Sequence, residues 1–186
     1  MIEVSGVICM DFHEIHKFEL FDAYDINEQK LNIDLVRGKS HEDGLYHIVV
    51  EIITMNEKGE ILLTKRHPRK NYGLYWEITG GSILKGEDVL SGAIRELEEE
   101  TGIKTTKESL KLIYKEVFYD GLFRGFFHQV DMTHQTITLQ SDETIEYQWV
   151  SKCDFVEHIC QTDFIPHTRA RILHAWEIIE PILFCE

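Results

Sequence analysis

Three glutamates at helical spacing are the residues of this chain best suited to chemistry. Glu96, Glu99 and Glu100 stand at positions i, i+3 and i+4, which places their carboxylates on one helix face, about a turn apart. Like charges at this spacing repel one another, so the cluster gives the helix no structural benefit. Carboxylate oxygens are hard ligands that suit Mg²⁺ or Mn²⁺. The spacing therefore predicts a divalent-metal site.

The residues around these glutamates are typical of a helix docked on a sheet. Apolar side chains recur every four residues, away from the glutamates: Val89, Ala93 and Leu97. The helix is expected to begin near residues 87–88, where acidic side chains suit its positive end, and to end at Gly102 as a left-handed cap. Gly92 costs the helix about 1 kcal/mol relative to alanine. We expect this glycine to leave room for a ligand.

Two charged loops could complete such a site. The one dense basic run of the chain precedes the glutamates and holds Lys65, Arg66, Arg69 and Lys70. It is either a solvated loop or a patch that faces phosphates. A later acidic loop at residues 141–146 carries Glu143 and Glu146. These two are either a solvated face or further carboxylates that reach the metal.

The composition limits the classes of partner. The 186 residues include 19 Lys and Arg against 33 Asp and Glu, which gives a net charge of −14. This balance argues against nucleic acid or an anionic membrane as the main partner, because phosphate backbones require a basic surface. No apolar run is long enough to span a membrane, and no secretory signal is evident. Four scattered cysteines are expected as reduced thiols in a cytoplasmic protein.

Alternating and β-branched runs predict an α/β protein with a mixed sheet. Strands are expected at 18–25, 31–36, 47–55, 60–66, 75–79, 110–119, 122–132, 136–139 and 147–151, with helices after residue 87 and at 152–160 and 167–184. We expect one domain over 1–186. Residues 1–45 form an N-terminal extension with a β-hairpin, and 152–186 supply the C-terminal helices. His13 and His16 in the extension are interpreted as exposed residues rather than ligands.

The stretch 81–103 resembles the Nudix box, G-x5-E-x7-R-E-U-x-E-E-x-G-U, where U is a bulky aliphatic residue. Every fixed position matches: Gly81, Glu87, Arg95, Glu96, Leu97, Glu99, Glu100, Gly102 and Ile103. A chance match to so many fixed residues is rare at ordinary residue frequencies. The resemblance covers at least residues 46–151 and implies the α/β/α sandwich of the Nudix family.

The resemblance also implies roles for individual residues. The three glutamates would hold one to three Mg²⁺ or Mn²⁺ ions, together with the backbone carbonyl of Gly80. Arg95 would orient the carboxylates, and Glu87 would brace the loop before the helix. The general base would be Glu96 itself or a later carboxylate, with Glu143 preferred to Glu146. The substrate would be a nucleoside diphosphate, or another small organic pyrophosphate, linked to a group X. The basic run would contact its phosphates.

The chain is also similar to the isopentenyl-diphosphate-isomerase branch of the family. This similarity does not extend to the catalytic residues of the isomerase. His47 stands where the isomerase has a metal-binding histidine, and we count it among the candidate substrate-binding residues. Gly80 stands where the isomerase has its catalytic cysteine, and Ser82 replaces its second motif histidine. We therefore expect a pyrophosphohydrolase. An isomerase and a non-catalytic sensor of pyrophosphate ligands are the alternatives, and a homodimer is possible.

Overall fold

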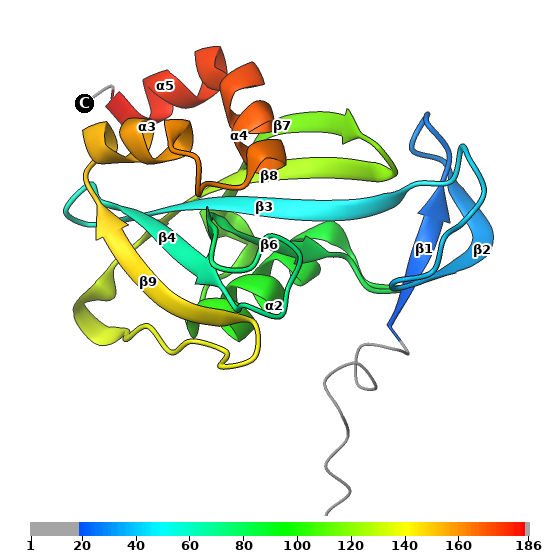
Figure 1. Cartoon of the computed structure of the whole chain (residues 1–186), viewed down its shortest axis with the longest axis horizontal. Helices are drawn as coiled ribbons and strands as arrows, with labels where there is room; N and C mark the ends of the chain where they lie inside the picture. The colour runs from blue at the N-terminus through cyan, green and yellow to red at the C-terminus, as the bar shows by residue number, and fades with distance from the viewer. Residues whose placement is uncertain (1–18, 185–186) are drawn as a thin grey trace, which may run out of the picture.

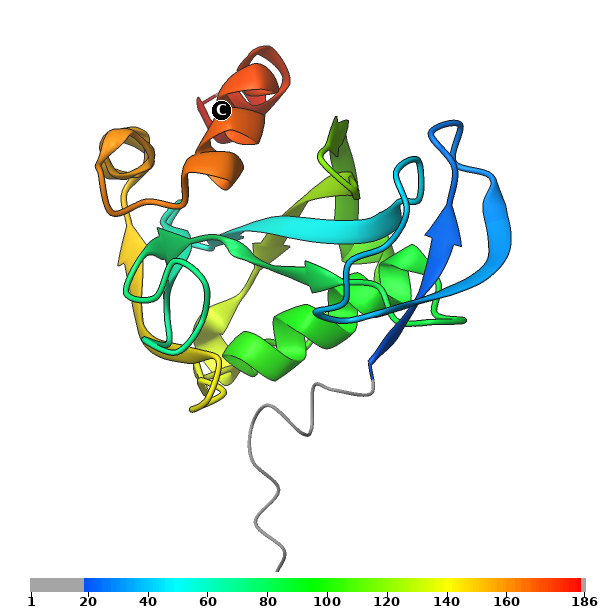
Figure 2. The ribbon, with the colours of Figure 1, turned by 45° about the vertical axis from the view of Figure 1, so that its right-hand side comes forward.

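A mixed sheet lies between two layers of helix in the computed structural model, which describes residues 19–184 (Figure 1). Five strands follow the order β5-β4-β3-β8-β7, while β6 pairs with β3 and β9 pairs with β4. The strands are β3 His47–Asn56, β4 Ile61–Arg66, β5 Trp76–Glu77, β6 Thr79–Ser82, β7 Leu110–Phe118, β8 Gly121–Val130 and β9 Thr144–Val150. Helix α2 (Val89–Thr101) covers one face, and α3 (Lys152–Cys160), α4 (Pro166–His174) and α5 (Trp176–Phe184) cover the other (Figure 2). The expected α/β/α sandwich is confirmed.

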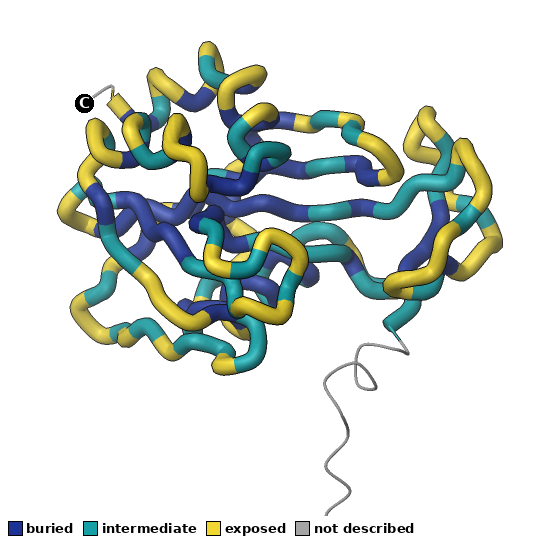
Figure 3. Tube along the Cα trace, viewed as in Figure 1, coloured by how far each residue is buried: buried dark blue, intermediate teal, exposed yellow. Residues whose placement is uncertain are grey.

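Strand β3 is the centre of the molecule. It runs parallel to β8 from the pair His47↔Gly121 to the pair Asn56↔Val130, and antiparallel to β6 on its other edge. Alternate residues such as Val50 and Ile52 join the core under α2, while Ile53 and Met55 join the core under α3–α5. Because both faces are covered, β3 is dark along most of its length in Figure 3. This explains its run of β-branched residues.

A separate hairpin, β1 (Leu20–Tyr24) and β2 (Lys30–Val36), stands at one end of the sheet (Figure 1). Its strands pair antiparallel, as the alternating sequence predicts. Phe21, Ala23 and Leu35 form a small core of their own. Two backbone hydrogen bonds between Tyr24 and Tyr46, of 2.8 and 2.9 Å, join the hairpin to the residue before β3. The hairpin therefore has a fixed position beside the central strand.

Helix α2 begins and ends where the sequence indicates. The Asp88 side chain caps its start by accepting a hydrogen bond from the Ser91 N–H at 3.1 Å. Gly102 ends it in the left-handed conformation, with φ of 73°. The expectation for Gly92 was wrong. A Cβ there would lie 2.3 Å from Ile83 and 2.8 Å from the Glu87 carboxylate, so the missing side chain makes room for neighbours of the helix rather than for a ligand.

Three of the expected strands differ from the structure. The strand at 75–79 is two strands, because the chain changes partner at Ile78: β5 pairs with β4, and β6 pairs with β3. Residues 136–139 form no strand and instead cross the end of α2, where the Thr138 N–H donates to the Thr101 carbonyl. Strand β9 starts at Thr144, inside the expected acidic loop, because Lys65 and Arg66 of β4 extend the pairing.

The helix expected at 167–184 is broken into α4 and α5. Ala175 separates them, and its N–H is shared between the carbonyls of Arg171 and Leu173. The break lets Ile172, Ile179 and Leu183 all reach the core. Leu173, expected in the same stripe, is exposed. No helix within residues 19–184 is long and apolar enough to cross a membrane.

Two short 3₁₀ helices, Lys107–Ser109 and Met132–His134, complete the described elements. Two of the four cysteines, Cys153 and Cys160, are exposed and free, as expected of reduced thiols. Cys9, Cys185, His13 and His16 lie outside the described residues.

Candidate active site

The box glutamates line a cavity of about 210 Å³ between α2, β6, the hairpin and two loops. Its residues are Glu19, Arg37, Lys70, Gly80, Gly81, Arg95, Glu96, Glu99, Glu100, Gln140 and Glu143. Glu96 and Glu100 are buried, whereas Glu99 is exposed at the mouth of the cavity. Glu98, the remaining glutamate of this run, faces solvent on the other side of the helix. The structure thus brings together the three carboxylates that the helical spacing selects.

Arg95 holds the carboxylates in place. Its Nε and Nη2 donate to the two carboxylate oxygens of Glu87 at 3.0 and 2.9 Å. Its Nη1 donates to Glu96 at 2.8 Å and to Glu99 at 3.0 Å. Glu87 in turn accepts a hydrogen bond from the Leu84 N–H at 3.1 Å, which ties the loop to the helix start. One guanidinium therefore orients three carboxylates, because its donors form a rigid planar fork.

Two glycines let the strand approach the carboxylates. A Cβ on Gly81 would lie 2.3 Å from the carboxyl carbon of Glu96, so only glycine fits beneath that side chain. A Cβ on Gly80 would lie 2.4 Å from the Val50 carbonyl of the neighbouring strand. The Gly80 N–H points toward the Glu100 carboxylate at 3.4 Å. The backbone of β6 thus forms one wall of the cavity.

The buried carboxylates are strained electrostatically in the absence of a cation. Burial raises the pKa of Glu96, against the opposing effect of the Arg95 guanidinium. Burial raises the pKa of Glu100 well above its ordinary range, and the nearby Glu77 carboxylate adds to this. Both shifts reflect the cost of negative charge in a dry site. A hard divalent cation relieves that cost, so the donor set fits Mg²⁺ or Mn²⁺.

The four residues of the basic run lie in different surroundings, and only some of them are near the cavity. The Lys70 ammonium contacts the Glu143 carboxylate and lies 3.9 Å from Glu100. Arg66 is engaged by Glu77 through two hydrogen bonds of 2.9 and 2.8 Å, and Arg69 is exposed outside the cavity. Lys65 lies 3.3 Å from Glu146 on the neighbouring strand. Of the four basic residues, Lys70 alone is among those that line the cavity.

The two glutamates of the expected acidic loop also lie in different places. Glu143 faces the cavity beside Lys70, whereas Glu146 is an exposed residue of β9 outside the cavity lining. His47 is likewise outside it, with its ring stacked on Phe21 at 5.1 Å. Burial lowers the pKa of His47, which keeps the imidazole neutral near pH 7.

Several residues at or near the site are absent from the sequence-based set. Glu19, Arg37 and Gln140 line the cavity, but they are brought there by the hairpin and a loop, for which no local pattern exists. Glu77 lies near Glu100 and is buried, and burial raises its pKa against the effect of Arg66. A charged residue in the middle of an apolar strand was a signal that could have revealed Glu77.

The fold and the cavity define a class of protein, namely an enzyme that presents clustered carboxylates to a phosphate-containing substrate. A model of the NUDIX domain matches residues 45–169. The chain belongs to the Nudix hydrolase family, whose members act on pyrophosphate bonds and generally need divalent metal ions.

Known proteins agree with this assignment. The chain is 29% identical over 151 residues to an uncharacterized Nudix hydrolase of Listeria monocytogenes, a match that covers 80% of this chain and 89% of the relative. A crystal structure of a Deinococcus radiodurans protein superposes with a TM-score of 0.64 at 15% identity, over 78% of this chain and 91% of that one. The MutT protein of Methanosarcina mazei superposes with a TM-score of 0.54 at 26% identity, over 71% of this chain and 94% of that one.

Proposed function

We propose that this pyrophosphohydrolase cleaves the diphosphate linkage of a nucleoside diphosphate, or of another small organic pyrophosphate, joined to a group X, with Mg²⁺ or Mn²⁺ as the cofactor. The observation that carries the proposal is the convergence of Glu96, Glu99 and Glu100 on one cavity wall, oriented by Arg95. The same cavity contains one lysine of the basic run, which can contact phosphate oxygens.

In this proposal Glu96, Glu99, Glu100 and the Gly80 carbonyl hold the cofactor. When bound, such a metal lowers the pKa of a water molecule and neutralises charge at phosphorus. Arg95 keeps the carboxylates aimed at the cavity. Glu143 is the preferred general base, because it shares the cavity with the box glutamates. Lys70 beside it holds a phosphate oxygen.

The first test is metal-dependent turnover in box variants. Glu99→Gln and Glu100→Gln are each expected to reduce Mg²⁺-dependent release of phosphate or nucleotide by about 100-fold or more, because each removes a metal ligand. Glu98→Gln is the matched control. Its side chain is on the same helix but lies 3.8 Å from Lys104 on the exposed face, so activity should be unchanged. Full turnover in both ligand variants would refute the assignment of the site.

The second test identifies the substrate. It measures hydrolysis of a panel of compounds, each with Mg²⁺ and with Mn²⁺. Nucleotide sugars, ADP-ribose, NADH, dinucleoside polyphosphates and isoprenoid diphosphates cover the main choices of X. Isopentenyl diphosphate in deuterated water also tests the isomerase alternative, which predicts deuterium incorporation. The relatives reported above include a Nudix hydrolase and a MutT protein, and none of them is described as an isomerase.

A further inference from the structure

A second group of metal-ligating side chains lies outside the box cavity. His41, His47 and Asp120 each offer one ligand atom, and these atoms all lie within 4.8 Å of one another. They come from three segments: the loop after β2, the first residue of β3, and the turn between β7 and β8. None of them lines the cavity of the box glutamates. The catalytic proposal leaves this group without a role.

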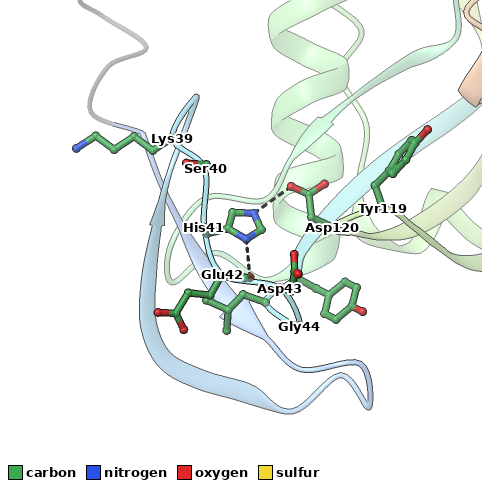
Figure 4. Close-up of a pocket in the computed structure, with 10 residues that line it drawn as sticks. Lys39, Ser40, His41, Glu42, Asp43, Gly44, Tyr119 and Asp120 are labelled. Atoms are coloured by element: carbon green, nitrogen blue, oxygen red, sulfur yellow. Dashed lines mark hydrogen bonds and ion pairs between the residues drawn. The ribbon is translucent and has the colours of Figure 1, made fainter.

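The contacts of His41 give it the orientation of a metal-binding histidine. Its Nδ1 lies 3.3 Å from the Glu42 carbonyl oxygen, which can only accept, so the proton of the ring belongs on Nδ1. The neutral ring then presents a lone pair at Nε2, yet Nε2 lies 3.0 Å from an Asp120 carboxylate oxygen (Figure 4). Two acceptors that face each other need a cation or a second ring proton between them. A histidine whose far nitrogen donates to a carbonyl is typical of metal ligands.

The surroundings favour a positive ion. A pocket of about 580 Å³ opens beside His41 and Asp120, and Figure 4 shows the loop and turn that line it. Two further acidic residues, Glu42 and Asp43, line this pocket against one lysine, Lys39. Arg37, which borders a smaller cavity that His47 also lines, has its charge paired with Glu19 at 2.5 Å. The local charge therefore suits a cation that enters from solvent.

The site is also partly preorganised. The His47 N–H donates to the Asp120 carbonyl at 2.9 Å, which fixes the turn beside the strand. Stacking on Phe21 holds the His47 ring, with an interplanar angle of 17°. Ligand atoms about 2.1 Å from a tetrahedral ion are about 3.4 Å apart. Because His41 Nε2 and the Asp120 carboxylate are 3.0 Å apart and no pair of ligand atoms exceeds 4.8 Å, only a small side-chain adjustment is needed to hold an ion.

We propose that His41, His47 and Asp120 form a second metal site, selective for a borderline-soft divalent ion of the Zn²⁺ class. Two imidazoles and one carboxylate suit Zn²⁺ or Co²⁺ better than Mg²⁺, which prefers oxygen ligands. Three protein ligands leave a fourth position open toward the pocket. The bound ion ties the loop after β2 to the sheet. This loop follows Arg37, which lines the catalytic cavity, so the ion secures the hairpin side of that cavity.

The test measures Zn²⁺ binding in a protein whose box is disabled. In the double variant Glu99→Gln with Glu100→Gln, calorimetry is expected to show one bound Zn²⁺, and Co²⁺ is expected to give the visible absorption of a tetrahedral site. Adding His41→Ala or Asp120→Asn should weaken Zn²⁺ binding by at least about 10-fold. Removing a residue that only hydrogen-bonds to a metal ligand already costs about this much, so loss of a ligand itself should cost no less. Adding His134→Ala, an exposed histidine elsewhere, should leave binding unchanged.

Two results would overturn the proposal. One is the absence of stoichiometric Zn²⁺ binding by the double variant, or equal binding after His41→Ala and His134→Ala. The other is a plain ion pair between His41 and Asp120: the NMR signals of the His41 ring would then change in Asp120→Asn and would not respond to added Zn²⁺. Circular dichroism establishes that each variant is folded. Because no readout depends on hydrolysis, failure here is distinct from failure of the proposed function.

Discussion

At the scale of single residues, the site depends on the absence of side chains as much as on carboxylates. Glu96 lies where a Cβ on Gly81 would collide with it, and Arg95 aligns it from the other side. In this position the carboxylate leaves no room for a Cβ on Gly81. This geometry explains why glycine occupies the first position of the box, for which the sequence alone offers only backbone freedom as a reason.

Gly81→Ala is expected to reduce kcat/KM by about 10- to 100-fold with Mg²⁺, the range typical when a metal ligand loses its support. The added methyl group displaces the Glu96 carboxylate, so the affinity for Mg²⁺ should fall as well. Steady-state kinetics across Mg²⁺ concentrations measures both effects.

Gly59→Ala is the matched control, because Gly59 has a positive φ of 76° that strains a side chain, and its Cβ would meet only the Lys152 side chain, away from the box. We expect it to lower stability while the folded enzyme keeps its kcat. Equal losses of kcat in the two variants would show that general strain, rather than Glu96, explains the effect.

At the scale of elements, α2 was predictable because its pattern is local. The apolar repeat, the Asp88 cap and the Gly102 cap are all within a few residues of the turns they control. The break at Ala175 was not predictable, because α4 and α5 bend to fit a core made by distant strands. The same holds for residues 136–139, which pair with no strand and lie against the end of α2 instead.

Strand β8 contains a histidine that makes stability depend on pH. His128 is 2% exposed, and burial lowers its pKa to about 4, with the Thr105 hydroxyl 2.7 Å from its Nε2. In the unfolded chain its pKa is about 6.5. The neutral ring therefore favours the folded state above pH 6.5, and this contribution is lost as the pH falls from 6.5 toward 4.

Between pH 7 and pH 5, His128 should account for a loss of about 2 kcal/mol in the free energy of unfolding. Urea unfolding at the two pH values measures it. His128→Gln should remove this part of the pH dependence, whereas His134→Gln, at an exposed position, should retain it. An unchanged pH dependence in His128→Gln would mean that the folded and unfolded states bind the proton equally.

At the scale of the whole molecule, β3 joins the two helical layers through a buried ion pair. Glu51 of β3 receives two hydrogen bonds from Arg171 of α4, of 2.8 and 2.5 Å, and one each from Thr168 and Tyr114. The Arg171 guanidinium also lies 3.6 Å above the Phe123 ring. Glu51 pairs with Gly80 across the sheet, so this network supports the strand beneath the box glutamates.

Arg171→Met is expected to cost about 3–5 kcal/mol in the free energy of unfolding, because it leaves Glu51 charged and buried without a partner. Adding Glu51→Gln should recover most of that loss, since the unpaired charge is then gone. Urea unfolding of the two variants and the parent gives the comparison. A double variant no more stable than Arg171→Met would contradict the role assigned to the pair.

This long-range order limits what the sequence could reveal about the site. The box residues were found because they are contiguous, and Glu143 was found as an acidic residue in a loop. Arg37 and Glu19 reach the cavity only because the hairpin docks beside β3, and neither carries a local signal. The parallel pairing of β3 with β8, more than 70 residues away, is of the same kind. Residues that come together only through tertiary contacts are not marked by any periodic pattern in the sequence.

The Glu51–Arg171 pair has a consequence for the order in which the chain is made. The two residues are 120 positions apart, and Arg171 is synthesised only after the whole Nudix box. Until α4 leaves the ribosome, β3 carries an acid that cannot be buried at low cost, so the sheet under the box cannot settle. A prematurely terminated chain would contain the entire Nudix box and still lack its rigid support. Synthesis of α4 is thereby coupled to assembly of the cavity.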